Sequence, residues 1–217
     1  MTFSPPSASR QVEIGRLLRA STTGCVIGCR VNQIDVPSFG CMVSIPLQPG
    51  YGVYGLIHDI HIDDDGLVRQ LITADGVPED VIQDNRQNRN VPVEMSVLLI
   101  GYQQNGRIYH LLPPRPPLSL DAILLCSDED TCRFSSAGRF GYFRHILRAE
   151  ELPVGELLAA HLQNVERAQR ASGNPGWIAA ATQELITLLR DDYPTLMAVL
   201  GALGDADLQY QSEGGLR

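Results

Sequence analysis

Short runs of apolar and β-branched residues, separated by turn residues, fill the first half of the chain. The runs cover residues 12–19, 25–31, 41–46 and 51–62, with glycine, proline, asparagine and aspartate between them. Runs of this length with such boundaries predict β-strands rather than helices. We therefore expect a strand-rich unit over residues 11–112.

Two tight turns organise this unit. Asp65-Gly66 predicts a hairpin that returns over residues 67–73, and Asn105-Gly106 predicts one that joins residues 93–102 to 108–112. We expect the polar residues 74–92 between the hairpins to leave the sheet as a long loop, here called the polar excursion, with one helical turn at residues 78–83. About six short strands with close turns favour a small closed β-barrel, because closure removes exposed sheet edges.

The pattern changes after four prolines within residues 113–117. Such a segment is typical of a stiff, extended connector, and we expect residues 113–119 to be a plain spacer rather than a recognition motif. Residues 120–203 then predict a helical domain. Its expected helices cover residues 154–171, 176–190 and 195–203, with a short one within 140–147, and Asp128, Glu129 and Asp130 suit a helix N-terminus.

The expected fold class is therefore α+β, with an N-terminal barrel of about six strands followed by a C-terminal helical domain. We expect residues 1–10 and 204–217 to be flexible tails. The chain has no apolar run of the roughly 18–20 residues that a membrane span needs, and no apolar stretch near residue 1 predicts a secretion signal. These features predict a cytoplasmic protein without membrane partners.

The composition limits the chemistry. All 17 basic residues among the 217 are arginine, which excludes a Walker A loop or Schiff-base chemistry within this chain. The net charge of −8 argues against a general binder of nucleic acids. Five cysteines, an odd number in a chain of this length, do not indicate a disulfide scaffold. We expect no cofactor.

Short glycine motifs in the strand-rich half resemble a known family. They are Ile-Gly-Arg at residues 14–16, Phe-Gly-Cys-Met-Val at 39–43 and Tyr-Gly-Leu-Ile at 54–57. Over roughly residues 12–112 the chain resembles the HAS-barrel, the small β-barrel at the N-terminus of HerA-type DNA-translocating ATPases and of ATP synthase α and β subunits. Small barrels of the translation-factor type share much of the same pattern of short strands and glycines.

The resemblance implies a role in assembly rather than catalysis. In HerA and ATP synthase the barrel precedes an ATPase core with a P-loop, whereas here about one hundred mostly helical residues follow. What carries over is the docking role of the barrel. The resemblance implies a non-catalytic assembly or adaptor subunit of a HerA-like ATPase or of its nuclease partner, and a homo-oligomer stays open.

A nucleic-acid-binding barrel is the alternative function. It would depend on Arg86 and Arg89 in the polar excursion. It would also use three arginines near Phe140, Tyr142 and Phe143, namely Arg139, Arg144 and Arg148. Arginine interleaved with aromatic residues binds single strands. The spacing of these arginines favours a solvated helix face instead.

A metal-dependent hydrolase is the third hypothesis. Asp59, His61 and Asp63 alternate along a predicted strand and would share one face. Three ligands at this spacing span about 13 Å on a regular strand, too far to reach one ion. An exposed strand face that ends in an acidic turn is therefore the favoured interpretation.

Overall fold

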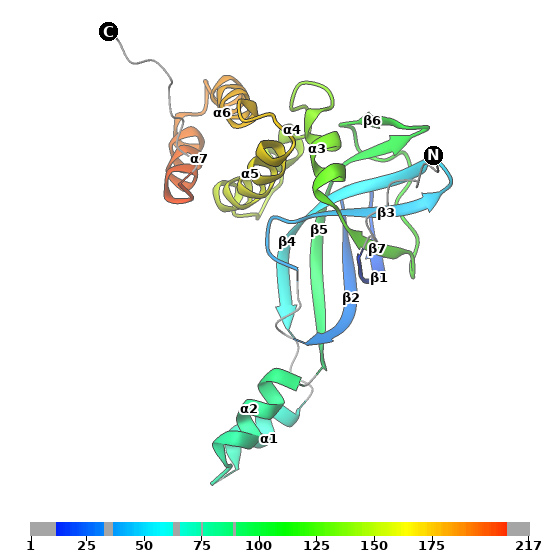
Figure 1. Cartoon of the computed structure of the whole chain (residues 1–217), viewed down its shortest axis with the longest axis vertical. Coiled ribbons are helices and arrows are strands. Elements are labelled where there is room, and N and C mark those ends of the chain that lie inside the picture. The colour runs from blue at the N-terminus through cyan, green and yellow to red at the C-terminus, as the bar shows by residue number, and fades with distance from the viewer. Residues whose placement is uncertain (1–11, 33–36, 63–65, 75, 89, 208–217) are drawn as a thin grey trace, which may run out of the picture.

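The computed structural model describes residues 12–32, 37–62, 66–74, 76–88 and 90–207. Six antiparallel strands close into a barrel, in the order β2, β1, β7, β3, β4, β5, and β5 pairs with β2 to complete it (Figure 1). β6 extends the sheet beyond β5. The strands are β1 Val12–Ala20, β2 Gly24–Asn32, β3 Met42–Gln48, β4 Tyr51–Ile62, β5 Asn90–Gln104, β6 Arg107–Tyr109 and β7 Ala122–Leu125. The expected barrel is confirmed.

Alternate residues of each strand fill the barrel. Ile27, Ile45, Val53, Leu99 and Ile123 come from five different strands, and each has 0% of its surface exposed. This follows from the two-residue period of a strand, which directs every second side chain inward.

One barrel strand comes from beyond the proline-rich connector. β7 pairs with β1 through Val12 and Leu125 and with β3 through Val43 and Leu125. The range 120–203, for which only helices were expected, therefore begins with a strand of the barrel. Four residues are too few to show a strand period in the sequence.

The two predicted hairpins have different outcomes. The turn at Asn105 and Gly106 is confirmed, and both residues have positive φ, 50° and 80°, as a two-residue hairpin turn requires. The other hairpin is wrong. The residues expected to form its return strand form a helix instead, α1, Leu67–Thr73. A second helix, α2, Glu79–Asn88, follows where a single helical turn was expected. β4 pairs instead with the long β5, which supplies the partner for its whole length.

The later helices match the prediction closely. They are α3 Asp128–Ser136, α4 Phe143–Leu147, α5 Val154–Ala171, α6 Trp177–Leu188 and α7 Tyr193–Asp205. The acidic residues expected at a helix N-terminus form the first turn of α3. Ser127 caps this helix, since its hydroxyl accepts from Asp130 N while Asp130 accepts from the Ser127 backbone.

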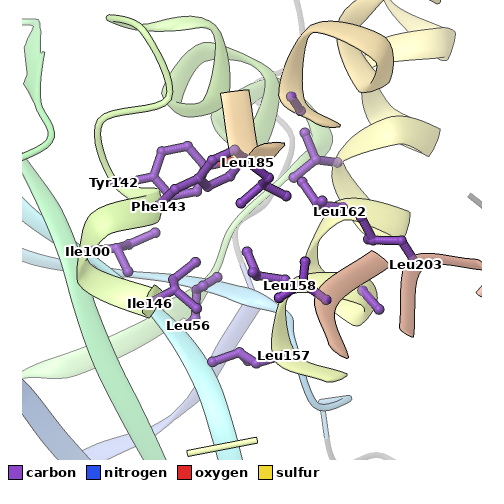
Figure 2. Close-up of a cluster of buried hydrophobic side chains, with 14 of the residues drawn as sticks. Leu56, Ile100, Tyr142, Phe143, Ile146, Leu157, Leu158, Leu162, Leu185 and Leu203 are labelled. Atoms are coloured by element: carbon purple, nitrogen blue, oxygen red, sulfur yellow. The ribbon is translucent and has the colours of Figure 1, made fainter. Parts of the chain in front are cut away.

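A second core joins the helices to the outer face of the barrel. Leu56 of β4 and Ile100 of β5 point toward Ile146 of α4, and Leu158 of α5 packs in the same cluster (Figure 2). All four side chains have 0% of their surface exposed. The helical layer therefore shares a continuous apolar core with the barrel, in which α4 contacts β5, while α6 and α7 pack on α5.

Candidate functional site

The metal-ligand candidates lie at the far end of β4. Asp59 and His61 are exposed there, just after a β-bulge at His58, and Asp63 lies outside the described residues. Within the described ranges, no three histidine, cysteine, aspartate or glutamate side chains come together in a way that could hold a metal ion. Asp59 and His61 share the outward face of the strand, as their spacing predicts.

The arginine candidates fall into different surroundings. Arg89 and the side chain of Arg86 lie outside the described residues. Arg139 is exposed in the loop before α4, whereas Arg144 and Arg148 border one hollow beside the barrel. The structure thus brings two of the five predicted arginines together.

The aromatic residues expected to accompany these arginines belong to the core. Tyr142 and Phe143 have 0% of their surface exposed, and Phe140 stacks on Phe143 with ring centroids 5.4 Å apart. Stacking of a nucleic-acid base requires an accessible ring face. Tyr142 and Phe143 therefore offer no surface for single-strand binding.

Arg144 has a structural partner. Its Nη2 donates to the carbonyl oxygen of His110, which also lies 3.1 Å from His145 Nε2. Burial lowers the pKa of both His110 and His145 below the usual value for histidine, so both rings are neutral near pH 7. The shared carbonyl links α4 to the end of β6.

A broad hollow, here called the β5 groove, lies between the outer face of the barrel and α4. Its volume is about 760 Å³, and Leu98, Leu112 and Leu152 contribute apolar lining. A second hollow of about 380 Å³ adjoins it at His58 and extends to Arg19. Together they form a continuous, largely apolar depression across β2, β4 and β5.

The charges around the β5 groove are mixed. Arg144 and Arg148 lie on one side, Glu150 and Glu151 follow on the same rim, and Arg19 borders the adjoining hollow. Arg148 is exposed and forms no ion pair within the described part of the chain. An apolar floor with charged edges suits a peptide or helix better than a small molecule.

The buried cysteines are poor nucleophiles. Burial raises the pKa of the Cys25 thiol to about 12 and raises that of Cys126 further. A thiol reacts as its thiolate, and both groups stay protonated at neutral pH.

Three exposed leucines form a second surface feature, here called the leucine patch. Leu18, Leu118 and Leu120 have 44%, 71% and 72% of their surface exposed. Leu18 is on β1, Leu118 lies in the proline-rich connector, and Leu120 directly follows the connector. Exposed leucines are common singly, but a group held close together indicates an interaction site.

Hydrogen bonds fix the leucine patch on β1. Leu120 N donates to Leu17 O at 2.8 Å, and Ser119 Oγ donates to Leu18 O at 3.3 Å. Arg16 Nη1 donates to Leu120 O at 3.2 Å. These bonds hold the backbone of the patch against β1, while the leucine side chains face solvent.

The backbone of Leu120 is strained. Its φ of 72° lies in the left-handed region, which costs an L-residue with a Cβ about 1–2 kcal/mol. The turn is closed by Leu118 N, which donates to Asp121 Oδ2 at 2.8 Å. The side chain of Leu120 is largely in water, so its burial does not offset this cost within the isolated fold.

The sequence interpretation missed this surface because the connector was read as a plain spacer. A signal was present: two leucines separated by one residue, Leu118 and Leu120, follow a proline-rich segment that has no strand or helix period. Their exposure, however, depends on the pairing of the connector with β1, which the sequence does not show.

Comparisons with protein-family models and with curated proteins find no match to this chain. Among the described residues, no helix combines the length and apolar character needed to cross a membrane. The fold and surface thus define a barrel protein with a packed helical layer and a preformed apolar patch.

Proposed function

We propose that this protein is a non-catalytic assembly or adaptor subunit that docks a protein partner through the leucine patch. The observation that carries the proposal is Leu120, which is 72% exposed and held in a left-handed backbone conformation by hydrogen bonds to β1. A leucine on a fixed backbone loses less conformational entropy on entering a partner's pocket than one on a mobile loop.

The size of the patch suits a binding hot spot. Complete burial of a leucine side chain contributes roughly 1.5–3 kcal/mol. Leu118 and Leu120 are about seven-tenths exposed and Leu18 less than half exposed, so their burial would contribute about 3–5 kcal/mol in total. A contribution of this size is typical of the few residues that dominate an interface.

The HAS-barrel resemblance supports the identity of the partner. Barrels of that family organise ring assembly or partner docking, and this chain has a closed six-stranded barrel and no lysine for a P-loop. A HerA-like ATPase, or the nuclease that works with it, is the proposed partner.

Affinity purification of the tagged protein from its native host tests this proposal. We expect a ring ATPase or nuclease at near-equal amounts, lost in Leu118→Asp and Leu120→Asp variants. Leu188→Asp is the matched control, because Leu188 on α6 is 44% exposed but lies outside the patch. Recovery of nucleic acid that nuclease treatment removes, with no protein partner, would instead favour the nucleic-acid-binding alternative.

A further inference from the structure

The α1 and α2 helices, here called the helical hairpin, make few contacts with the other described elements. They project from the barrel end where β4 finishes and β5 starts, away from α3–α7 (Figure 1). Within the described residues, neither helix packs extensively against another element. Helices of 7 and 10 residues are marginal alone in water, so a contact from another molecule would stabilise them.

The first turn of α2 in the helical hairpin presents an acidic and apolar surface. Val81 and Ile82 of α2 are 38% and 41% exposed. Glu79 and Asp80, in the first turn of the same helix, are also exposed. The surface that covers this hairpin should therefore combine apolar side chains with positive charge.

The β5 groove has this combination. Leu98, Leu112 and Leu152 are apolar, and Arg148 on the rim is an exposed cation without an ion pair in the described residues. Arg19 lies at the other end of the depression, with its side chain 70% exposed and only a 3.7 Å contact to Glu94. Glu150 and Glu151 on the same rim as Arg148 would repel the acidic turn of α2, so the attraction comes from Arg148 and Arg19.

The groove and the hairpin of one chain are too far apart to meet. Both flank β5, but the groove lies at Leu98 and the hairpin joins the strand near Asn90. Eight residues of strand span about 27 Å. The helices also point away from the barrel, so a contact between these surfaces has to form between two molecules.

We propose that the helical hairpin of one copy docks in the β5 groove of a second copy. Val81 and Ile82 would cover the leucines of the groove, and Glu79 and Asp80 would approach Arg148 and Arg19. Each molecule carries one hairpin and one groove, so the contact closes either as a two-fold dimer with two equivalent interfaces or as a head-to-tail ring.

Light scattering and sedimentation of the purified full chain test the proposal. We expect a defined oligomer at concentrations up to about 100 µM in low salt, a range that reveals weak interfaces, and weaker association in high salt. Val81→Glu and Arg148→Glu should each raise the dissociation constant at least about tenfold. Arg190→Glu is the control, since this arginine is 74% exposed and lies outside the groove.

A charge exchange makes the test specific. Glu79→Arg alone should weaken association, and the double variant Glu79→Arg/Arg148→Glu should restore it, because the opposite charges meet again across the interface. Circular dichroism shows whether each variant is folded. A monomer at every concentration, or an oligomer unaffected by these variants, would overturn the proposal, as would failure of the double variant to recover.

Leu118 and Leu120 of the leucine patch lie outside the helical hairpin and are not among the residues that line the β5 groove or the adjoining hollow. Leu118→Asp should therefore abolish partner recovery while the oligomer persists, so failure of one proposal is distinguishable from failure of the other.

Discussion

His161 makes the stability of this protein depend on pH. It lies on α5 with 0% of its surface exposed, and its Nε2 is 3.1 Å from the hydroxyl of Tyr142. Its Nδ1 has no hydrogen-bond partner among the described residues. Burial lowers the pKa of His161 from 6.5 to about 4, and the backbone of Gly40 only partly offsets this effect. The imidazole is therefore neutral in the folded protein.

The sign of the effect follows from the proton balance. Between pH 6.5 and about 4 the unfolded chain binds a proton at His161 that the folded chain does not, so acid favours unfolding. The stability is complete above pH 6.5 and falls by about 3 kcal/mol in total as the pH drops through the folded pKa. Between about pH 7.5 and about pH 5 the expected loss is about 2 kcal/mol.

Urea unfolding at these two pH values, followed by the fluorescence of the single tryptophan, Trp177, measures the effect. His161→Leu should remove about 2 kcal/mol of the pH dependence, but it leaves the buried Tyr142 hydroxyl unpaired, which costs about 1–3 kcal/mol at neutral pH. The double variant Tyr142→Phe/His161→Leu should recover most of that cost, because both polar groups are then replaced by apolar ones.

Other histidines that are at least partly buried also contribute to the pH dependence of stability. The test therefore compares the pH dependence of the double variant with that of the wild type. Burial lowers the pKa of His58, His110 and His145 as well. Leu188→Gln, at an exposed position that does not titrate, is the control and should keep the wild-type pH dependence. If the double variant loses as much stability as the wild type between the two pH values, the assignment to His161 is refuted.

Three further predictions concern single positions, each measured by thermal or urea unfolding. Gly40→Ala should destabilise the fold by about 3 kcal/mol or more, because φ is 80° and a Cβ would lie 2.6 Å from Ala160 Cβ. The control is Gly76→Ala, at φ 73° and in open space, which should cost only about 1–2 kcal/mol. Equal losses would contradict this packing argument. Leu120→Asn should stabilise the isolated protein by about 0.5–1 kcal/mol because asparagine tolerates the left-handed region, and a loss of stability would show that the leucine supports the fold. Ser127→Ala should cost about 1 kcal/mol by removing the cap of α3, and the replacement of the exposed Thr187 by alanine should cost less.

The sequence predicts those parts of the fold that local patterns encode. The barrel and the helix Val154–Ala171 are predicted correctly because their apolar periods run for many residues. The hairpin at Asp65-Gly66 is wrong because residues 67–73 form an apolar run too short to distinguish strand from helix. β4 pairs instead with β5, a strand that begins more than twenty residues later in the chain.

The candidate sites show the same limit. Arg144 and Arg148 do border the β5 groove, but their aromatic neighbours Tyr142 and Phe143 face the core, which a short helix with apolar residues on several sides does not reveal. The leucine patch depends on hydrogen bonds between the connector and β1, which join residues about one hundred positions apart. Contacts of that range are set by the tertiary fold.

The placement of β7 after the connector has a consequence for how the chain folds during synthesis. Val12 pairs with Leu125, so β1 and β3 keep unpaired edges until the ribosome has released residue 125. Until then the nascent barrel is an open sheet, the form most prone to pair with other chains. Contacts between such distant residues also slow folding, because the long loop must close first. A nascent chain stalled before β7 should therefore be protease-sensitive over β1, and protection should appear only once β7 has emerged.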